Sequence, residues 1–160
     1  MYKRQTDSCA KILADNQLTV VFIESATAGY LSHCFSMSPY SGDVLIGGLV
    51  CYDASIKKKV LNVSDQLIEK FTPESAEVTR ELVHQSKALF DADVYVACTG
   101  LLTPGGSETE EKPVGTFFYC IGYKGEVYDF RVLCDGSPEQ KLNSISSLIC
   151  NSIIEVVNNH

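Results

Sequence analysis

Residues 18–29 read LTVVFIESATAG, and this stretch decides the fold. Its first six residues are almost all apolar and rich in β-branched side chains, which is typical of a strand buried on both faces. The segment from Thr27 to about Met37 then predicts a helix, which ends before Pro39. A buried strand that runs directly into a helix favours an α/β protein with parallel strands.

Two further apolar runs predict buried strands, at residues 44–52 (VLIGGLVCY) and 94–98 (VYVAC). The adjacent Gly47 and Gly48 in the first of them predict a bulge or a close backbone approach. Two more strands are expected at about 114–123 and 127–134. The three residues between them allow only an antiparallel pair.

Helices are expected between and around these strands. They are predicted at about residues 2–16, 27–37, 54–61, 63–71, 73–92 and 138–157. For the helix that starts at Pro73, Thr72 is the expected N-cap. The order of elements predicts one α/β domain over residues 1–160, with a mostly parallel five-stranded sheet covered by helices on both faces.

The composition excludes several classes of protein. The net charge of −7 over 160 residues argues against nucleic acid as a partner, because phosphate binding needs a concentrated basic surface. No run approaches the roughly 18 apolar residues that span a membrane, and the N-terminus has no apolar signal core. We therefore expect a cytoplasmic protein. In the basic run 57–59, Lys58 and Lys59 are expected to face solvent.

The seven cysteines are odd in number and contain no C-x-x-C pair, which disfavours a disulfide framework. Most lie in apolar runs, where a free thiol serves as a small buried side chain in a reducing compartment. The three histidines have no ligand-like spacing. The sequence therefore predicts neither a metal site nor a cofactor.

Candidate site residues follow the ends of the predicted strands, where α/β proteins bind their ligands. After the first strand, Ser25 and Thr27 are expected at the positive end of a helix dipole, which suits a nucleophile, an oxyanion or a phosphate. The alternative is that either hydroxyl only caps the helix. After the second strand, Lys57 could act as a base if burial lowers its pKa, or anchor a phosphate if not, and Tyr52 could donate a hydrogen bond.

A glycine-rich loop follows the third strand. Its glycines could let the backbone approach a ligand or offer N–H groups to an anion, and a flexible surface loop is the alternative. The candidate residues there and at the opening of the next strand are Thr99, Gly100, Gly105, Gly106, Gly115 and Thr116.

Together these segments resemble the CinA C-terminal domain family, in its stand-alone form. That family carries Glu-Ser-Cys-Thr-Gly-Gly after its first strand, matched by residues 24–29, and Tyr-Ser-Asn-x-x-Lys, matched by Tyr52 and Lys57. It also carries Thr/Ser-Gly-x-x-x-Pro-x-Gly and Lys-Pro-Val-Gly-Thr, matched by residues 99–106 and 112–116. The chain departs from these patterns, and from the family's segment after the last strand, at Ala26, Ala28, Ala54 and Pro138.

The resemblance implies a three-layer α/β/α sandwich with a mixed sheet, and hydrolysis of the carboxamide of nicotinamide mononucleotide to nicotinic acid mononucleotide and ammonia. Ser25 or Thr27 would attack, Lys57 would be the base and Tyr52 would orient the reaction. No metal or cofactor is implied, and the partner is a small nucleotide. The implied substrate-binding residues are Glu24, Gly29, Thr99, Gly100, Gly105, Gly106, Gly115 and Thr116.

Two other functions are compatible with the sequence. The departures from the family pattern favour a non-catalytic nucleotide- or phosphate-binding protein that keeps the pocket. In a third interpretation the strand around Gly47 and Gly48 is a packing surface of an assembly subunit, and a homo-oligomer is an open expectation. If the chain is a Ser/Thr–Lys hydrolase, the five residues Ser25, Thr27, Tyr52, Lys57 and Thr99 should share one cleft. One hydroxyl should then lie about 3 to 5 Å from the Lys57 nitrogen.

Overall fold

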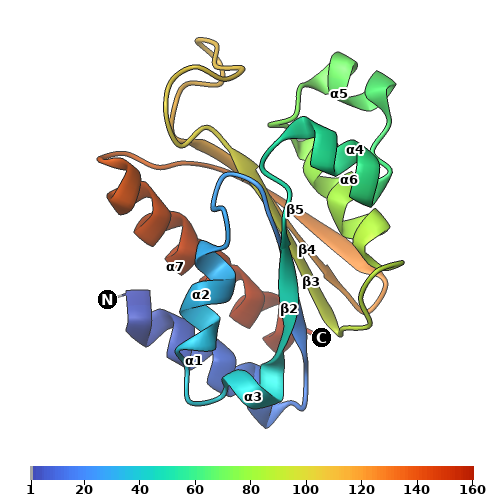
Figure 1. Ribbon diagram of the computed structural model, residues 1–160. Coiled ribbons are helices and arrows are strands. Elements are labelled where there is room, and N and C mark those ends of the chain that lie inside the picture. Colours follow the sequence, from blue (N-terminus) through green and yellow to red (C-terminus); the bar gives the residue numbers. More distant parts are fainter. Residues whose placement is uncertain (1) are drawn as a thin grey trace.

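The computed structural model describes residues 2–160 as one five-stranded sheet between two layers of helices (Figure 1). The strands are β1 Val20–Glu24, β2 Leu45–Val50, β3 Val94–Gly100, β4 Thr116–Tyr123 and β5 Glu126–Leu133. The helices are α1 Tyr2–Asp15, α2 Tyr30–Ser36, α3 Ser41–Val44, α4 Ala54–Leu61, α5 Asp65–Phe71, α6 Ala76–Ser86 and α7 Pro138–Asn158. The predicted α/β class and the three-layer α/β/α arrangement are confirmed.

Strand β1 lies inside the sheet and is buried along its whole length, as its apolar run predicts. Successive side chains of a strand point to opposite faces. Val20 and Phe22 therefore join the core under α1, α2 and α7, whereas Val21 and Ile23 join the core under α4 and α6. The same strand thus holds both helix layers to the sheet.

The sheet order is β2-β1-β3-β4-β5. Strand β1 pairs in parallel with β2 and β3, but the β3–β4 and β4–β5 pairs are antiparallel. The prediction of a mostly parallel sheet therefore needs correction. Residues 101–115 return the chain to the same end of the sheet at which β3 stops, so that Gly100 pairs with Phe117. This return reverses β4, and the short turn after Tyr123 reverses the chain again.

Strand β2 differs from its prediction as a strand buried on both faces. It forms one edge of the sheet, and partly buried and exposed residues alternate along it. The predicted bulge lies directly before the glycine pair, because Val20 pairs with Leu45 and Val21 pairs with Gly47, so that the register skips Ile46. A Cβ atom on Gly48 would lie 2.4 Å from the hydroxyl oxygen of Ser32, so a side chain there would collide with α2.

Three predicted helix boundaries were wrong. Thr72 does not begin α6 but ends α5, with a φ of 69°. The N-cap of α6 is Ser75, whose hydroxyl accepts a hydrogen bond from the backbone N–H of Val78. This helix ends at Ser86, before the predicted residue 92, and α2 begins at Tyr30 instead of Thr27.

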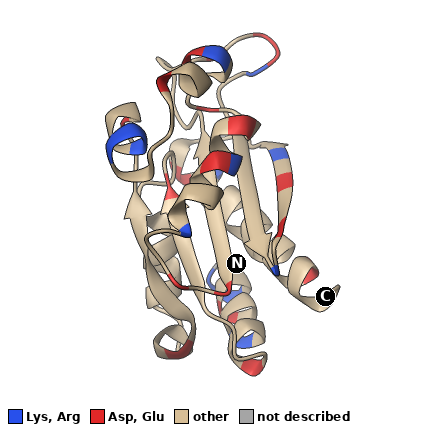
Figure 2. Ribbon diagram, turned by 90° about the vertical axis from the view of Figure 1, so that its right-hand side faces the viewer, with Lys and Arg blue, Asp and Glu red and all other residues tan. Residues whose placement is uncertain are grey.

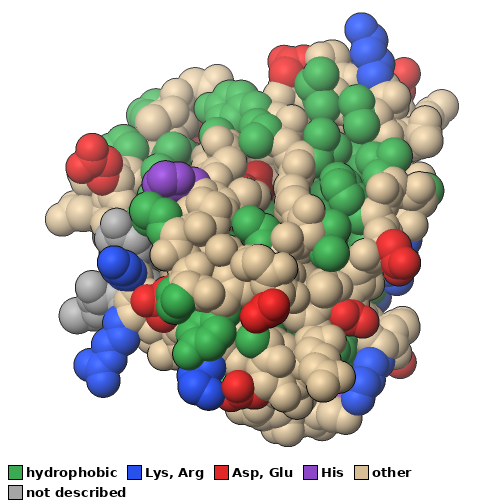
Figure 3. All heavy atoms as spheres, turned by 60° about the horizontal axis from the view of Figure 1, so that its bottom comes forward, with side chains coloured by type: hydrophobic (Ala, Val, Ile, Leu, Met, Phe, Trp, Pro, Cys, Tyr) green, Lys and Arg blue, Asp and Glu red, His purple; other side chains and the backbone are tan. Residues whose placement is uncertain are grey.

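The surface mixes charged and apolar side chains. Acidic and basic residues are distributed over most of the elements (Figure 2). Several large apolar side chains are exposed, and on one face hydrophobic side chains gather in patches among the charged ones (Figure 3). The exposed apolar side chains include Ile46 and Val50 on the edge strand β2. No helix within residues 2–160 combines the length and apolar character needed to cross a membrane.

Candidate active site

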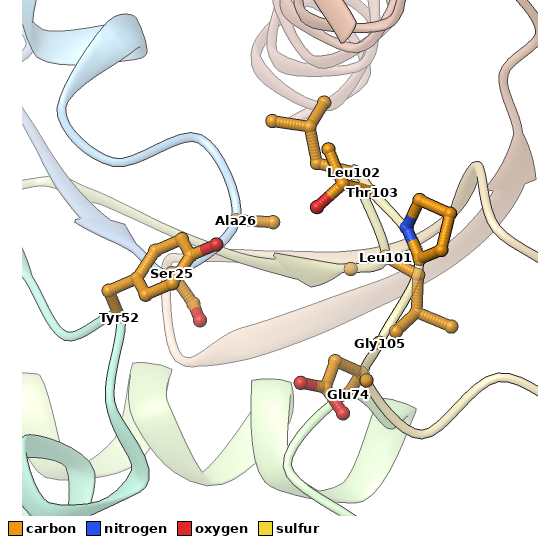
Figure 4. A pocket seen from close by; sticks show the side chains of 11 residues that line it. Ser25, Ala26, Tyr52, Glu74, Leu101, Leu102, Thr103 and Gly105 are labelled. Atoms are coloured by element: carbon orange, nitrogen blue, oxygen red, sulfur yellow. The ribbon is translucent and has the colours of Figure 1, made fainter.

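A pocket opens at the end of the sheet where β1 and β3 finish and β2 leads into α4. Figure 4 shows Ser25 and Tyr52 on one side of it, the glycine-rich loop on the other and Glu74 along a third. It is lined by Ser25, Ala26, Tyr52, Glu74, Gly100, Leu101, Leu102, Thr103, Pro104, Gly105 and Gly106. The prediction that a pocket lies at the ends of the parallel strands is therefore confirmed.

Ser25 is fixed at this edge by the sheet itself. Its backbone N–H donates to the carbonyl of Cys98 on β3, 2.9 Å away, which continues the β1–β3 ladder by one residue. On the other side, the N–H of Cys51 donates to the carbonyl of Glu24, also at 2.9 Å. The chain after β2 is thereby held beside Ser25, and α4 follows it directly.

The side chain of Lys57 lies beneath Ser25 and is only 1% exposed. Its Nζ is 2.9 Å from Ser25 Oγ, 2.6 Å from the carbonyl oxygen of Cys51 and 3.3 Å from that of Tyr52. The expected distance between a hydroxyl and the lysine nitrogen is therefore confirmed for Ser25. Lys58 and Lys59, the next residues of α4, are exposed as predicted.

Burial lowers the pKa of Lys57 from its usual range, and the nearby Cys51, Glu74 and Asp53 oppose this shift only in part. In its charged form the amine can donate to all three oxygens, whereas in its neutral form it has two N–H donors and one lone pair. The two carbonyl groups can only accept hydrogen bonds, so they match the two N–H donors. The lone pair is then left for the hydroxyl of Ser25, which is the arrangement that a general base needs.

Thr27 does not share this arrangement. Its hydroxyl donates to Glu24 Oε2 over 2.7 Å, and the Thr27 side chain is 2% exposed. Glu24 is itself buried, and its carboxylate also accepts from the backbone N–H groups of Gly29, Leu31 and Ser32 and from the Ser32 hydroxyl. The expected role of Glu24 as a substrate ligand has no support in this geometry.

The position of the Glu24 carboxylate shows that a second prediction was wrong. Ser25 and Thr27 were expected at the positive end of a helix dipole, but α2 starts only at Tyr30. The backbone N–H of Tyr30 donates to the carbonyl of Thr27, and those of Leu31 and Ser32 donate to Glu24, so these groups are not available to a ligand. Gly29, another expected substrate ligand, has a φ of 94° and also donates to Glu24. The turn is therefore organised around a buried carboxylate.

Thr99 was expected in the same cleft but lies elsewhere. It is fully buried, and its hydroxyl pairs with that of Thr79 on α6 at 2.8 Å. The reason is the alternation of β3, which turns Thr99 toward α6. Tyr52 does line the pocket and is 61% exposed, so its ring lies at the mouth.

The glycine-rich segment divides into two parts. Gly100, Gly105 and Gly106 line the pocket as predicted, whereas Gly115 and Thr116 do not. Gly115 has a φ of 98° and packs against the carbonyl of Cys134, and the Thr116 hydroxyl donates to the carbonyl of Pro113. These two residues shape the return of the chain into β4.

A polar cluster that the sequence analysis missed ties the loop to the start of α6. Lys112 Nζ donates to Thr72 Oγ1 at 2.7 Å, to the carbonyl of Glu74 at 2.9 Å and to Ser107 Oγ at 2.9 Å. The Ser107 hydroxyl donates to Glu74 Oε2 at 2.6 Å. Lys112 begins the Lys-Pro-Val-Gly-Thr motif and could be noticed in the sequence. Glu74 does not follow a strand, so no sequence pattern indicated that Glu74 belongs to the site.

All seven cysteines are buried and free. Within residues 2–160, no group of three or more histidine, cysteine, aspartate or glutamate side chains is arranged to hold a metal ion.

Fold and site together define a three-layer α/β/α protein with a serine hydroxyl set against a buried lysine amine at the carboxyl-terminal edge of its sheet. A sequence profile of the CinA C-terminal domain matches residues 3–157. The chain belongs to the CinA C-terminal domain family.

Individual relatives agree with this assignment. The chain is 34% identical over 121 residues to Protein MG115 of Mycoplasma genitalium, covering 76% of each. It is also 34% identical over 116 residues to a CinA-like protein of Thermotoga neapolitana, covering 72% of this chain but 28% of that protein. The chain thus matches less than a third of the length of this longer CinA-like protein.

Solved structures share the fold over nearly the whole chain. A CinA superfamily protein of Escherichia coli is 26% identical with a TM-score of 0.90, covering 98% of this chain and 90% of that one. The competence damage-inducible protein A of Klebsiella pneumoniae is 21% identical with a TM-score of 0.92, covering 98% and 97%.

Proposed function

We propose that the protein is an amidohydrolase that hydrolyses the carboxamide of a nicotinamide ribonucleotide or a close relative. The observation that carries this proposal is the 2.9 Å contact between Ser25 Oγ and the buried Lys57 Nζ at the edge of the pocket. Serine–lysine pairs of this kind activate a hydroxyl for nucleophilic attack. Family membership supports the proposal, because the resemblance implies the same reaction.

The proposed reaction proceeds through an acyl-enzyme. Ser25 Oγ attacks the carboxamide carbon while its proton passes to Lys57 Nζ. The tetrahedral intermediate then collapses, the C–N bond breaks, and Lys57 returns the proton to the departing ammonia. A water molecule then attacks the resulting ester while Lys57 takes its proton. The ester bond breaks, the carboxylic acid is released, and Ser25 Oγ regains a proton from Lys57.

The oxyanion of the intermediate needs hydrogen-bond donors. Among the described residues no acceptor pairs with the backbone N–H of Ala26, which also lines the pocket. We assign this N–H to the oxyanion. The Ala26 side chain replaces a cysteine of the family pattern, but a backbone donor does not depend on the side chain.

The first test replaces Lys57 by methionine, which keeps an unbranched side chain one atom shorter and removes the amine. We expect ammonia release from nicotinamide mononucleotide to fall by about 10² to 10⁴-fold, the range that a general base contributes. Lys59→Met changes an exposed lysine of the same helix and should leave the rate within about twofold. Equal rates for wild type and Lys57→Met, in proteins with equal thermal unfolding midpoints, would contradict the proposal.

The pH dependence gives a second test. The base must be neutral to accept the proton, so the rate should rise with pH through the pKa of Lys57. Because burial lowers that pKa, the midpoint of the rise should lie below the ordinary lysine value of about 10.4. The measurement is kcat against pH for wild type and for any residual activity of Lys57→Met. A rise that persists unchanged in the variant would assign it to another group.

The non-catalytic alternative predicts a different outcome. A protein that only binds nucleotides should give a calorimetric titration with nicotinamide mononucleotide but no ammonia over hours. Turnover that Lys57→Met abolishes would exclude this alternative.

A further inference from the structure

The charges around the pocket are unusual for a site that takes a phosphorylated substrate. Among the described residues that line it, Glu74 has the only ionisable acidic or basic side chain apart from the phenol of Tyr52. Lys57 lies behind Ser25, and its amine is occupied by the three contacts given above. Lys112 is also occupied, since it holds Thr72, Glu74 and Ser107. Among residues 2–160, no lysine or arginine side chain therefore lines the pocket to meet a phosphate.

The backbone donors of the glycine loop are also occupied. The N–H of Gly105 donates to Glu108 Oε1 and the N–H of Gly106 to Glu108 Oε2, both over 2.8 Å. The two neighbouring amides thus hold one carboxylate in a bidentate manner, as such loops hold the oxygens of a phosphate. The Gly105 amide, as the main cause, lowers the pKa of the Glu108 carboxyl, so the group stays ionised at neutral pH.

Glu108 is held near the pocket by its neighbour. The hydroxyl of Ser107 donates to Glu74 Oε2, and Ser107 also accepts from Lys112. Because Ser107 is hydrogen-bonded to Glu74, the next residue, Glu108, lies near the pocket. The Glu74 carboxylate thus lies on the wall of the pocket, and the Glu108 carboxylate lies on the amides of Gly105 and Gly106 at its rim. Each carboxylate repels a dianionic group and attracts a cation; Glu74 also interacts with the charges of Lys57 and Lys112, whereas Glu108 is held by backbone amides.

We propose that this pocket selects a cationic N-ribosylpyridinium carboxamide without a phosphate, with Glu74 facing the positive ring and Glu108 occupying the amides that a phosphate would need. This inference rests on the proposed amidohydrolase function and narrows its substrate class. Nicotinamide riboside is the simplest compound of this class, and nicotinamide mononucleotide is the same compound with a 5′-phosphate. The mononucleotide binds only when its phosphate displaces the carboxylate of Glu108.

The test measures binding separately from turnover. Calorimetric titrations of Ser25→Ala, in which the proposed nucleophile is absent, compare nicotinamide riboside with nicotinamide mononucleotide. We expect the riboside to bind at least about tenfold more tightly. If the mononucleotide binds equally well or better, or if neither compound binds, the inference is overturned. Ammonia-release assays of wild type with both compounds test the proposed function independently of this preference.

Two substitutions test the assigned roles. Added to Ser25→Ala, Glu108→Gln removes the charge but keeps the size, and should tighten mononucleotide binding at least about fivefold while changing riboside binding less than twofold. Glu110→Gln, an exposed position in the same loop, is the matched control and should change neither. An unchanged preference in Glu108→Gln would overturn the role of this residue.

Glu74→Gln, in the same background, should weaken the cationic riboside at least about fivefold. The dihydropyridine form of the riboside has a neutral ring, so its binding should change less than twofold. Equal weakening of both compounds would show a merely structural role for Glu74 and overturn its assignment to the ring charge.

Discussion

Replacing Ser25 by alanine is expected to lower kcat/KM for ammonia release from nicotinamide mononucleotide by about a thousandfold or more. The Ser25 hydroxyl lies 2.9 Å from Nζ of Lys57, whereas the hydroxyl of Thr27 is hydrogen-bonded to Glu24. Loss of a nucleophile removes the covalent route altogether, so it has a larger effect than loss of a base that water can partly replace. The measurement is steady-state ammonia release, with circular dichroism to verify the fold.

Thr27 provides the matched comparison for this experiment. Its hydroxyl already donates to Glu24, so it cannot also present a free oxygen to the substrate without breaking that bond. We therefore expect Thr27→Ser to keep activity within about fivefold, because serine can make the same hydrogen bond. The proposal fails if Ser25→Ala stays active while Thr27→Ala does not. Mass spectrometry of acid-quenched enzyme should locate the acyl group on Ser25.

The two positions show what sequence reasoning can resolve about a site. That Ser25 and Lys57 meet follows from the rule that parallel strands end on one side of a sheet, so two distant segments could be brought together without a structure. Which hydroxyl faces the amine does not follow from that rule. It depends on the acceptor that each hydroxyl finds, and the carboxylate of Glu24 decides this.

For the fold, too, some features could be predicted from the sequence and others could not. Strands β1 and β3 were predicted well, because side chains buried on both faces leave a continuous apolar run. Strand β2 has a similar run but lies at the edge, and the order of strands across a sheet is not contained in the apolar pattern of any one of them. Glu74 and Glu108 were missed because they are acidic residues outside strand ends, where exposure to solvent is the usual expectation.

The turn around Glu24 leads to the second large effect, which is on stability instead of catalysis. Replacing Glu24 by glutamine should lower the free energy of unfolding by about 2 to 4 kcal/mol. An amide nitrogen cannot accept a hydrogen bond, so either the donors on Ser32 or those on Thr27, Gly29 and Leu31 lose their acceptor. Hydrogen bonds to a charged group are the stronger kind, and a buried donor without a partner is costly.

The measurement for Glu24→Gln is urea unfolding followed by circular dichroism, with Glu126→Gln as the control. Glu126 is exposed at the start of β5, so its substitution should change the unfolding free energy by no more than about 0.5 kcal/mol. Activity separates the two roles that Glu24 could have. If the carboxylate bound substrate, Glu24→Gln would keep its stability and lose activity through KM. Because the carboxylate is 1% exposed and accepts from five donors of its own turn, we expect the reverse: a clear loss of stability, with the remaining folded protein close to wild type in KM.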